Sequence, residues 1–273
     1  MTTDTVAKLT SRTAELGGRD TSAGEGGSAS GKTAGLERNV VTVTGFAKGA
    51  GMIEPHMATM LAYVFTDARI ERNDLHAALE AAVERSFNAI SVDGDTSTND
   101  ACVLVATGRG RALSPAEDAD WRAFTDALAA VLLDLAQAIV RDAEGATKFV
   151  TVRVTGGRGP AECRAVGYSV ARSPLVKTAM FASDANVGRL LMAIGKADVV
   201  ALDPVGVTVS LGGVRAFERG GIAPGYTEER GAAVMAEPEI LLEIDLGRGD
   251  AALELYTSDL SHGYVSVNAD YRS

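Results

Sequence analysis

Residues 45–66 read Gly-Phe-Ala-Lys-Gly-Ala-Gly-Met-Ile-Glu-Pro-His-Met-Ala-Thr-Met-Leu-Ala-Tyr-Val-Phe-Thr, and the rest of the chain is arranged around this stretch. The β-branched run that precedes it predicts a strand over 40–47. Gly49 and Gly51 can adopt positive φ and permit close approach of the backbone, and Pro55 fixes a bend. The stretch therefore begins as a strand, breaks at a glycine turn and bends.

A second apolar run follows the bend. Met60 to Phe65 predicts a strand buried on both faces. This order places the hydroxyl of Thr59 at the edge of a core, with Lys48 eleven positions earlier in the chain. Such a position suits a nucleophile, and a threonine hydroxyl needs a base to act as one.

Residues 48–61, Lys-Gly-Ala-Gly-Met-Ile-Glu-Pro-His-Met-Ala-Thr-Met-Leu, resemble the self-cleavage segment of a known family. The family is the bifunctional ornithine acetyltransferase/N-acetylglutamate synthase family of arginine biosynthesis. The resemblance implies cleavage of the bond between Ala58 and Thr59. Thr59 then becomes an N-terminal nucleophile, whose own α-amine, with a pKa of about 8 in peptides, serves as its base.

The resemblance also assigns substrate-binding residues along the chain. Besides Thr59 they are Thr2, Lys48, Glu144, Asn268 and Ser273. Lys48 would hold a substrate carboxylate. Glu144 lies near the end of a predicted helix, where a negative charge is mildly unfavourable, so binding of a substrate ammonium group gives it a reason to be there.

The implied reaction moves an acetyl group from N2-acetylornithine to glutamate, giving ornithine and N-acetylglutamate. It is a ping-pong transfer through an acetyl-Thr59 intermediate, without a metal and without a cofactor. Acetyl-CoA as a further acetyl donor for N-acetylglutamate synthesis stays open. The family also implies a heterotetramer of two α and two β chains after cleavage, acting in the cytoplasm.

Two departures from the family keep alternatives open. Met1 coincides with an internal Met of the family, so we expect the chain to lack the preceding segment that supplies an oxyanion hole from Ser/Thr-Thr-Gly. In 183–189, Ser-Asp-Ala-Asn-Val-Gly-Arg, Val187 replaces the family's Trp. The alternatives are a truncated non-catalytic homologue, a subunit that needs an N-terminal partner, and a related N-terminal-nucleophile amidase or aminopeptidase. Those hydrolases use Ser, which favours the acetyltransferase.

Composition narrows the classes of function. The chain has 273 residues and a net charge of −10, with a pI near 4.9, which argues against nucleic acid and anionic membranes as partners. Cys102 and Cys163 are far apart in sequence and indicate reduced thiols of a cytoplasmic protein. The longest apolar stretch, 128–140, is too short to span a bilayer, and no signal peptide is recognisable.

Two motifs resemble ligand-binding sites and fail on context. Residues 26–33, Gly-Gly-Ser-Ala-Ser-Gly-Lys-Thr, match a P-loop, but no strand precedes them and no long helix follows. In 91–100, Asp93 and Asp95 suggest a calcium loop, but Thr98 and Leu104 occupy the positions that need Gly and Glu. We expect this acidic loop to be a turn held by side-chain-to-backbone hydrogen bonds. The family resemblance, which includes Asp-Thr-Ser-Thr-Asn-Asp at 95–100, implies a second role in supporting the site.

The predicted fold is α+β (mixed α/β), a self-processing N-terminal-nucleophile fold with a smaller C-terminal α+β unit. We expect three parts: 1–58 with a flexible Gly/Ser-rich loop over 17–35, a catalytic core over 59–148, and a C-terminal domain over 149–273. Helices are predicted over 73–90, after a capping box at 114–117, over 160–172 and over 228–236. Strands are predicted over 101–107, 149–154, 206–211, 214–217, 239–245, 251–257 and 263–267.

Overall fold

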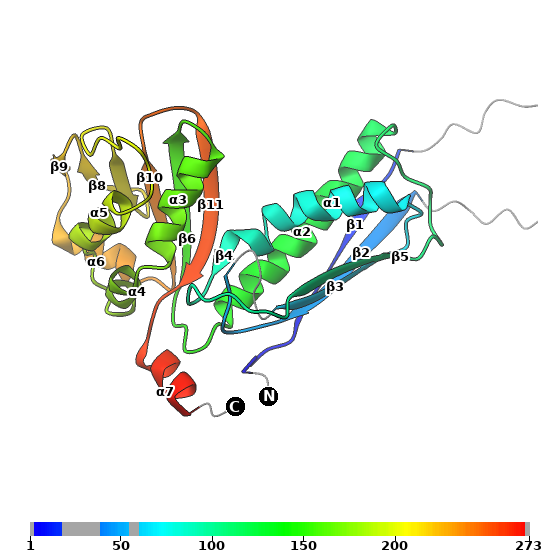
Figure 1. Cartoon of the computed structure of the whole chain (residues 1–273), viewed down its shortest axis with the longest axis horizontal. Coiled ribbons are helices and arrows are strands. Elements are labelled where there is room, and N and C mark those ends of the chain that lie inside the picture. The colour runs from blue at the N-terminus through cyan, green and yellow to red at the C-terminus, as the bar shows by residue number, and fades with distance from the viewer. Residues whose placement is uncertain (1–2, 18–38, 55–59, 271–273) are drawn as a thin grey trace, which may run out of the picture.

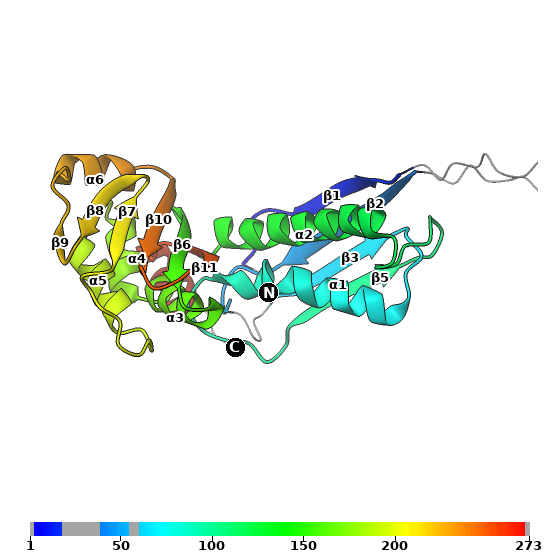
Figure 2. The same ribbon diagram turned by 90° about the horizontal axis from the view of Figure 1, so that it is seen from above.

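The computed structural model describes residues 3–17, 39–54 and 60–270, which build two β-sheets with their helices (Figure 1). The first sheet has four strands in the order β1-β2-β3-β5. They are β1 (Lys8–Glu15), β2 (Val40–Lys48), β3 (Leu61–Thr66) and β5 (Ala101–Ala106). β3 and β5 are parallel, and the other neighbours are antiparallel. Helices α1 (Arg72–Glu84) and α2 (Asp118–Arg141) cover one face, as Figure 2 shows from above.

The covered face of this sheet forms the first hydrophobic core. Alternate residues of β2 and β3 point toward the helices, and Val43 and Val64 are fully buried there. α2 contributes a stripe with helical spacing. Its members are all fully buried or nearly so: Phe124, Leu128, Val131, Leu132, Leu135 and Ile139.

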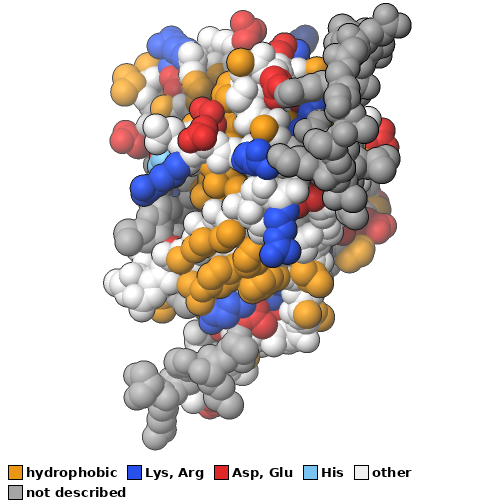
Figure 3. All heavy atoms as spheres, turned by 90° about the vertical axis from the view of Figure 1, so that its right-hand side faces the viewer, with side chains coloured by type: hydrophobic (Ala, Val, Ile, Leu, Met, Phe, Trp, Pro, Cys, Tyr) orange, Lys and Arg blue, Asp and Glu red, His pale blue; other side chains and the backbone are white. Residues whose placement is uncertain are grey.

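The other face of the four-stranded sheet is apolar and exposed. Leu9, Phe46, Tyr63 and Val103 are aligned across β1, β2, β3 and β5 by the strand register. Phe46 stacks on Tyr63, with ring centroids 5.4 Å apart, and Phe46 is 45% exposed. Figure 3 shows hydrophobic side chains gathered on this side of the molecule. The expectation that β3 is buried on both faces is therefore wrong for the described chain.

The second sheet has seven strands in the order β4-β11-β6-β10-β7-β8-β9. Its strands are β4 (Ile90–Ser91), β6 (Phe149–Gly157), β7 (Thr208–Leu211), β8 (Val214–Glu218), β9 (Gly221–Ile222), β10 (Glu239–Asp245) and β11 (Ala251–Ser258). Its helices are α3 (Pro160–Ala171), α4 (Pro174–Phe181), α5 (Val187–Gly195) and α6 (Glu228–Met235). β4 follows the short 3-10 helix η1 (Phe87–Ala89) and pairs with β11, so a segment that follows α1 joins this sheet.

The second core lies under α3 and α5, where Val152, Leu242 and Ile244 are almost completely buried. The opposite face of this sheet is polar. Arg153 on β6 forms ion pairs with Glu243 on β10 at 3.2 Å and with Glu254 on β11 at 2.7 Å.

Several predicted elements differ from the structure. The strand expected over 263–267 is helix α7 (His262–Asp270), which has no buried residue. The helix expected over 73–90 begins at Arg72, one residue earlier, and already ends at Glu84. The capping box at 114–117 closes a turn, in which the Glu117 N–H donates to the Ser114 carbonyl at 3.0 Å, and α2 begins at Asp118.

The remaining differences concern missed elements. β1 lies before the predicted loop, in a stretch for which no element was predicted, and α4 and α5 were not expected either. The α+β class is confirmed. β6 begins at Phe149, where the sequence places the start of the C-terminal domain. The P-loop-like stretch 26–33 and nearly all of the loop predicted over 17–35 lie outside the described residues.

One described helix, α2, is long and apolar enough to cross a membrane by length and composition alone. It contains the predicted apolar stretch 128–140 and extends it to 24 residues. Its apolar stripe packs into the first core, and a core helix passes the same test.

Candidate active site

The glycine turn after β2 packs against the residue that ends the α2 loop. A Cβ on Gly51 would lie 2.4 Å from the Glu144 Oε2 atom, so a side chain at position 51 would displace this carboxylate. The Glu144 N–H donates to the Ala50 carbonyl at 2.9 Å. The turn predicted from two glycines therefore packs against Glu144 and holds its backbone.

The Glu144 carboxylate joins segments that are far apart in sequence. Its Oε1 atom accepts a hydrogen bond from the Thr3 hydroxyl at 2.7 Å. Its Oε2 atom accepts one from the Asn268 side-chain amide, on α7, at 2.8 Å. Glu144 is only partly buried, so a carboxylate that contacts the beginning and the end of the described chain still faces solvent.

The loop that carries Glu144 is fixed by the segment between β11 and α7. The Asp259 carboxylate accepts hydrogen bonds from the Thr147 N–H at 2.7 Å, the Thr147 hydroxyl at 2.6 Å and the Lys148 N–H at 2.9 Å. The Ser261 hydroxyl donates to the Gly145 carbonyl at 2.5 Å. Gly145 has φ +66, and a Cβ there would collide with the backbone of α7.

The N-terminal segment fixes the other side of the glycine turn. The Gly49 N–H donates to the Asp4 carboxylate at 2.9 Å. Lys8, whose side chain is fully buried, forms ion pairs with Asp4 and with Asp142 at the end of α2. Burial alone would raise the pKa of Asp142, but hydrogen bonds from Lys8 and Thr5 outweigh it and hold this pKa below its usual value.

A buried lysine supports the segment from the opposite direction. The Lys177 Nζ atom on α4 donates to the Thr257 hydroxyl at 2.8 Å and to the Ser258 carbonyl. Burial lowers the pKa of Lys177 to about 7, against the opposing effect of the Asp259 and Asp93 carboxylates. This lysine therefore ties α4 to the strand end that leads to Asp259.

The acidic loop over 91–100 behaves as the sequence predicts. The Asp95 N–H donates to the Asp93 carboxylate, and the Asn99 N–H donates to the Ser97 hydroxyl, both at 3.2 Å. In the part of the chain that the structure describes, no group of three or more His, Cys, Asp or Glu is placed to hold a metal ion.

These contacts bring together sequence motifs that resemble one family, and a comparison with family models points to that family as well. The model described as the ArgJ family matches residues 1–273. The chain belongs to the ArgJ family.

Proteins named arginine biosynthesis bifunctional protein ArgJ are close relatives. The chain is 52% identical to that of Psychrobacter arcticus over 274 residues, covering 100% of this chain and 62% of the relative. It is 52% identical to that of Pseudomonas syringae pv. tomato over 235 residues, or 85% of this chain and 58% of the relative. For Neisseria gonorrhoeae the identity is 48%, over 100% of this chain and 63% of the relative. The chain thus spans about three fifths of the length of these curated relatives.

A solved structure is similar as well. The crystal structure of arginine biosynthesis bifunctional protein ArgJ from Bacillus halodurans superimposes with a TM-score of 0.72 at 36% identity. The match covers 77% of this chain and 98% of the solved chain.

The predicted ArgJ site residues fall into two groups. Lys48 lies at the exposed end of β2, three residues before Gly51, while Glu144 and Asn268 are in direct contact. Thr2, Ala58, Thr59 and Ser273 lie outside the described residues. The structure adds Thr3, Asp259 and Lys177 to this region. Thr3 follows the predicted Thr2 in sequence, whereas no role was predicted for Asp259 or Lys177.

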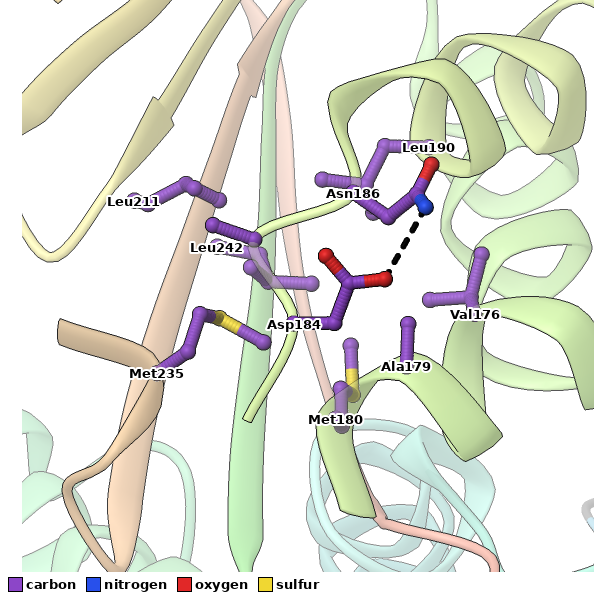
Figure 4. Close-up of a pocket in the computed structure, with 10 residues that line it drawn as sticks. Val176, Ala179, Met180, Asp184, Asn186, Leu190, Leu211, Met235 and Leu242 are labelled. Atoms are coloured by element: carbon purple, nitrogen blue, oxygen red, sulfur yellow. Dashed lines mark hydrogen bonds between the residues drawn. The ribbon is translucent and has the colours of Figure 1, made fainter. Parts of the chain in front are cut away.

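The stretch 183–189, in which the family resemblance led us to expect Trp at Val187, forms a separate cluster. Figure 4 shows Asp184 and Asn186 above a small pocket, joined by a hydrogen bond of 3.0 Å. The side-chain oxygen of Asn186, Oδ1, accepts a hydrogen bond from the Arg189 N–H and so caps the N-terminus of α5. The cavity has a volume of about 10 Å³, which holds at most one water. These contacts give the stretch a structural role.

Proposed function

We propose that this ArgJ-family chain is an acetyltransferase of arginine biosynthesis, acting in the cytoplasm on small molecules. It transfers an acetyl group from N2-acetylornithine to glutamate through an acetyl-Thr59 intermediate. The observation that carries the proposal is the contact of Glu144 with Thr3 and Asn268 on the glycine turn. Segments that are remote in sequence and match the family's substrate contacts meet at one partly exposed carboxylate.

In this proposal each group has a distinct task. The Glu144 carboxylate binds the ammonium group of the amino-acid substrate, and the Asn268 amide keeps that carboxylate oriented. The Lys48 ammonium group binds the substrate carboxylate. Thr59 accepts the acetyl group on its hydroxyl oxygen while its α-amine takes the hydroxyl proton.

Thr59 acquires this amine by self-cleavage. Breaking the Ala58–Thr59 peptide bond consumes one water, leaving a carboxylate on Ala58 and an α-amine on Thr59. The length of the solved ArgJ chain supports this step. The match spans about 210 residues, 77% of 273, and this is 98% of the solved chain. That length is close to the 215 residues that run from Thr59 to Ser273, and about half the length of the curated relatives.

Intact mass and denaturing gels test the self-cleavage. We expect two fragments, one ending at Ala58 and one beginning at Thr59, and a single uncut chain in Thr59→Ala. Ser is the matched variant because it keeps a hydroxyl, so Thr59→Ser should cut slowly. An uncut wild-type chain would contradict the proposal for the chain taken alone.

Acetyl transfer is measured separately. We expect labelled acetyl to pass from N2-acetylornithine to glutamate, and Glu144→Gln to raise KM for both amino acids by about tenfold, because an ionic hydrogen bond is lost. Acetyl-CoA as the donor tests whether the same protein also synthesises N-acetylglutamate. Release of acetate without an acceptor would instead favour the amidase alternative.

A second proposal follows from the exposed apolar face of the four-stranded sheet. We propose that the active form pairs this chain with a polypeptide equivalent to the two fifths of ArgJ relatives outside the match. Leu9, Phe46, Phe65, Val103 and Val105 are each 39–69% exposed on that face, and monomeric proteins rarely leave a large apolar patch uncovered. The α2β2 assembly that the family implies belongs to this proposal.

That proposal is tested by adding the remaining part of the Psychrobacter arcticus relative as a separate chain. We expect co-purification, and a rate of acetyl transfer above that of the present chain alone. Failure of the two chains to associate would contradict it.

A further inference from the structure

The chain on the upstream side of the predicted cleavage site is held by the acidic loop. The Asp93 carboxylate accepts the Met52 N–H at 2.7 Å through Oδ2 and the Ile53 N–H at 3.1 Å through Oδ1. The Val92 N–H donates to the Ile53 carbonyl at 2.8 Å. Ile53 is 1% exposed. Both backbone polar groups of this buried residue are therefore bonded to two consecutive residues of the loop.

The chain on the downstream side is held in the same way. The Met60 N–H donates to the Asp100 Oδ1 atom at 2.8 Å. The Ala101 N–H donates to the Met60 carbonyl at 3.1 Å. Met60 is 7% exposed, and β3 begins with the next residue. Again two consecutive residues, the last of the loop and the first of β5, bind both backbone groups of one buried residue.

The two residues that are held and the two aspartates that hold them have the same spacing in sequence. Six residues separate Ile53 from Met60, and six separate Asp93 from Asp100. Each end of the loop thus holds one end of the segment, with a carboxylate on the N–H and a backbone N–H on the carbonyl. Carboxylate acceptors form stronger hydrogen bonds with N–H groups than neutral acceptors do.

Further contacts stabilise the hydrogen bonds between Asp93 and the upstream side of the cleavage site. The buried Glu54 carboxylate accepts from the Arg172 Nε atom at 2.7 Å and from the Ser91 hydroxyl at 3.1 Å. The Tyr264 hydroxyl, on α7, donates to Asp93 at 3.3 Å. Since α7 also carries Asn268, the helix that contacts Glu144 is joined to the flank of the cleavage segment.

We propose that Asp93 and Asp100 are positioning residues of the self-cleavage, each fixing one flank of the segment that contains the Ala58–Thr59 bond. This inference rests on the self-cleavage proposed above. Because the two flanks are held separately, cutting the bond leaves both ends in place. Asp100 then keeps Met60, the residue that follows the cleaved bond by one position in sequence, in register with β3.

The decisive variants are at Asp100. Asp100→Ala removes the acceptor for the Met60 N–H, whereas Asp100→Asn keeps an oxygen in the same place. Asp95→Ala is the matched control, because Asp95 is an exposed carboxylate of the same loop whose side chain makes no hydrogen bond to a described residue. Cleavage is followed by intact mass in the full chain. Exchange of the Met60 amide is followed by NMR in the Thr59→Ala background, where the chain stays whole.

We expect Asp100→Ala to slow the appearance of the fragment beginning at Thr59 by about tenfold, the effect of one lost hydrogen bond. Its Met60 amide should exchange at least about tenfold faster, with the thermal midpoint little changed. Asp100→Asn and Asp95→Ala should resemble wild type in both measurements. Asp93→Ala should produce the same slowing through the Ile53 amide, and it replaces Asp100→Ala if that variant does not fold.

Two results overturn the inference and are distinguishable. If wild type is cut and both aspartate-to-alanine variants are cut at the same rate, the positioning role fails while the self-cleavage stands. If wild type is not cut, the proposed self-cleavage fails and the positioning role fails with it.

Discussion

The two sheets treat their uncovered faces in opposite ways. In the seven-stranded sheet that face carries Arg153 between Glu243 and Glu254, and it borders a cleft of about 730 Å³ beside α2. In the four-stranded sheet the corresponding face carries stacked rings, Phe46 with Tyr63 and Phe65. Both sheets pack helices against one face, so they differ in the residues of the other face, which are charged in one sheet and aromatic in the other.

The polar face of the seven-stranded sheet is compatible with solvent, whereas the aromatic face of the four-stranded sheet is typical of a surface that packs against protein. Antiparallel strands with one solvated face usually alternate apolar and polar residues, as β6 does with Val152, Arg153 and Val154. β3 instead reads Leu-Ala-Tyr-Val-Phe, apolar on both sides. The sequence therefore indicated a strand with two packed faces, and the structure shows one of them uncovered.

The largest expected effect tests whether the two cores are independent. Leu132→Ala in the first core and Leu242→Ala in the second should each cost about 3 kcal/mol of unfolding free energy, because both side chains are fully buried. Trp121, the single tryptophan, packs beside the first core and reports its unfolding by fluorescence.

Leu132→Ala should lower the urea midpoint of the transition that Trp121 fluorescence reports. Leu242→Ala should lower the midpoint measured by circular dichroism more than the midpoint measured by Trp121 fluorescence. Equal shifts of both signals by both variants would show that the two units unfold as one.

The next effect concerns the buried lysine of the second unit. The pKa of Lys177 is lowered from 10.5 to about 7 in the folded protein, so between these values the unfolded chain binds a proton that the folded chain does not. Stability should therefore rise between pH 7 and pH 9, by up to about 1.4 kcal/mol per pH unit. Lys177→Met should flatten this slope, as denaturant titrations at several pH values would reveal. A slope unchanged by the substitution would exclude Lys177 as its source.

A smaller effect on stability but a clear one on association is expected for the exposed rings. Phe46→Thr with Phe65→Thr keeps β propensity and should lower the unfolding free energy by about 2 kcal/mol, because the rings are 45% and 40% exposed and only their buried part is lost. Self-association measured by sedimentation should fall. Leu175→Thr, at an exposed position on α4, is the control and should leave association as it is.

The smallest effect is expected on the polar face. Arg153→Met leaves Glu243 and Glu254 without their shared partner, yet all three side chains are 34–41% exposed, so the loss should stay below about 1 kcal/mol. Salt should reduce the difference from wild type. A loss of several kcal/mol would mean that this face is less solvated than its exposure indicates.

Sequence reasoning succeeded where a local signal decides the structure. The glycine turn, the strand over 239–245 and the helix starting at Pro160 each follow from residues that favour one conformation. It failed where tertiary contacts decide. β1 has no alternation of apolar residues, since only Lys8 and Ala14 are buried in it, and it forms by pairing along the whole of β2.

The same division applies to α7 and to the site. Val265 and Val267 favour a strand, but no strand edge accepts this segment in the described structure, and the Ser261 hydroxyl accepts the Gly263 N–H at the start of the helix. Glu144 and Asn268 were predicted through a family resemblance, and the structure places them in contact. The loop with Asp93 and Asp100 was predicted first as a turn and second, through the family resemblance, as a support of the site. Its partners Ile53 and Met60 could not be predicted, because they lie about forty residues away.

The short strand β4 limits how this protein can be divided. Its two residues pair with Tyr256 and Thr257 of β11, although they precede Phe149 by nearly sixty positions. Separate expression of 1–148 and 149–273 would leave β11 as a bare sheet edge and expose Ile90, which is 1% exposed in the intact chain. Bare edges recruit strands from other molecules, so each half on its own should aggregate. A useful dissection must keep residues 90–91 with the second sheet, at the edge of β11 that faces away from β6.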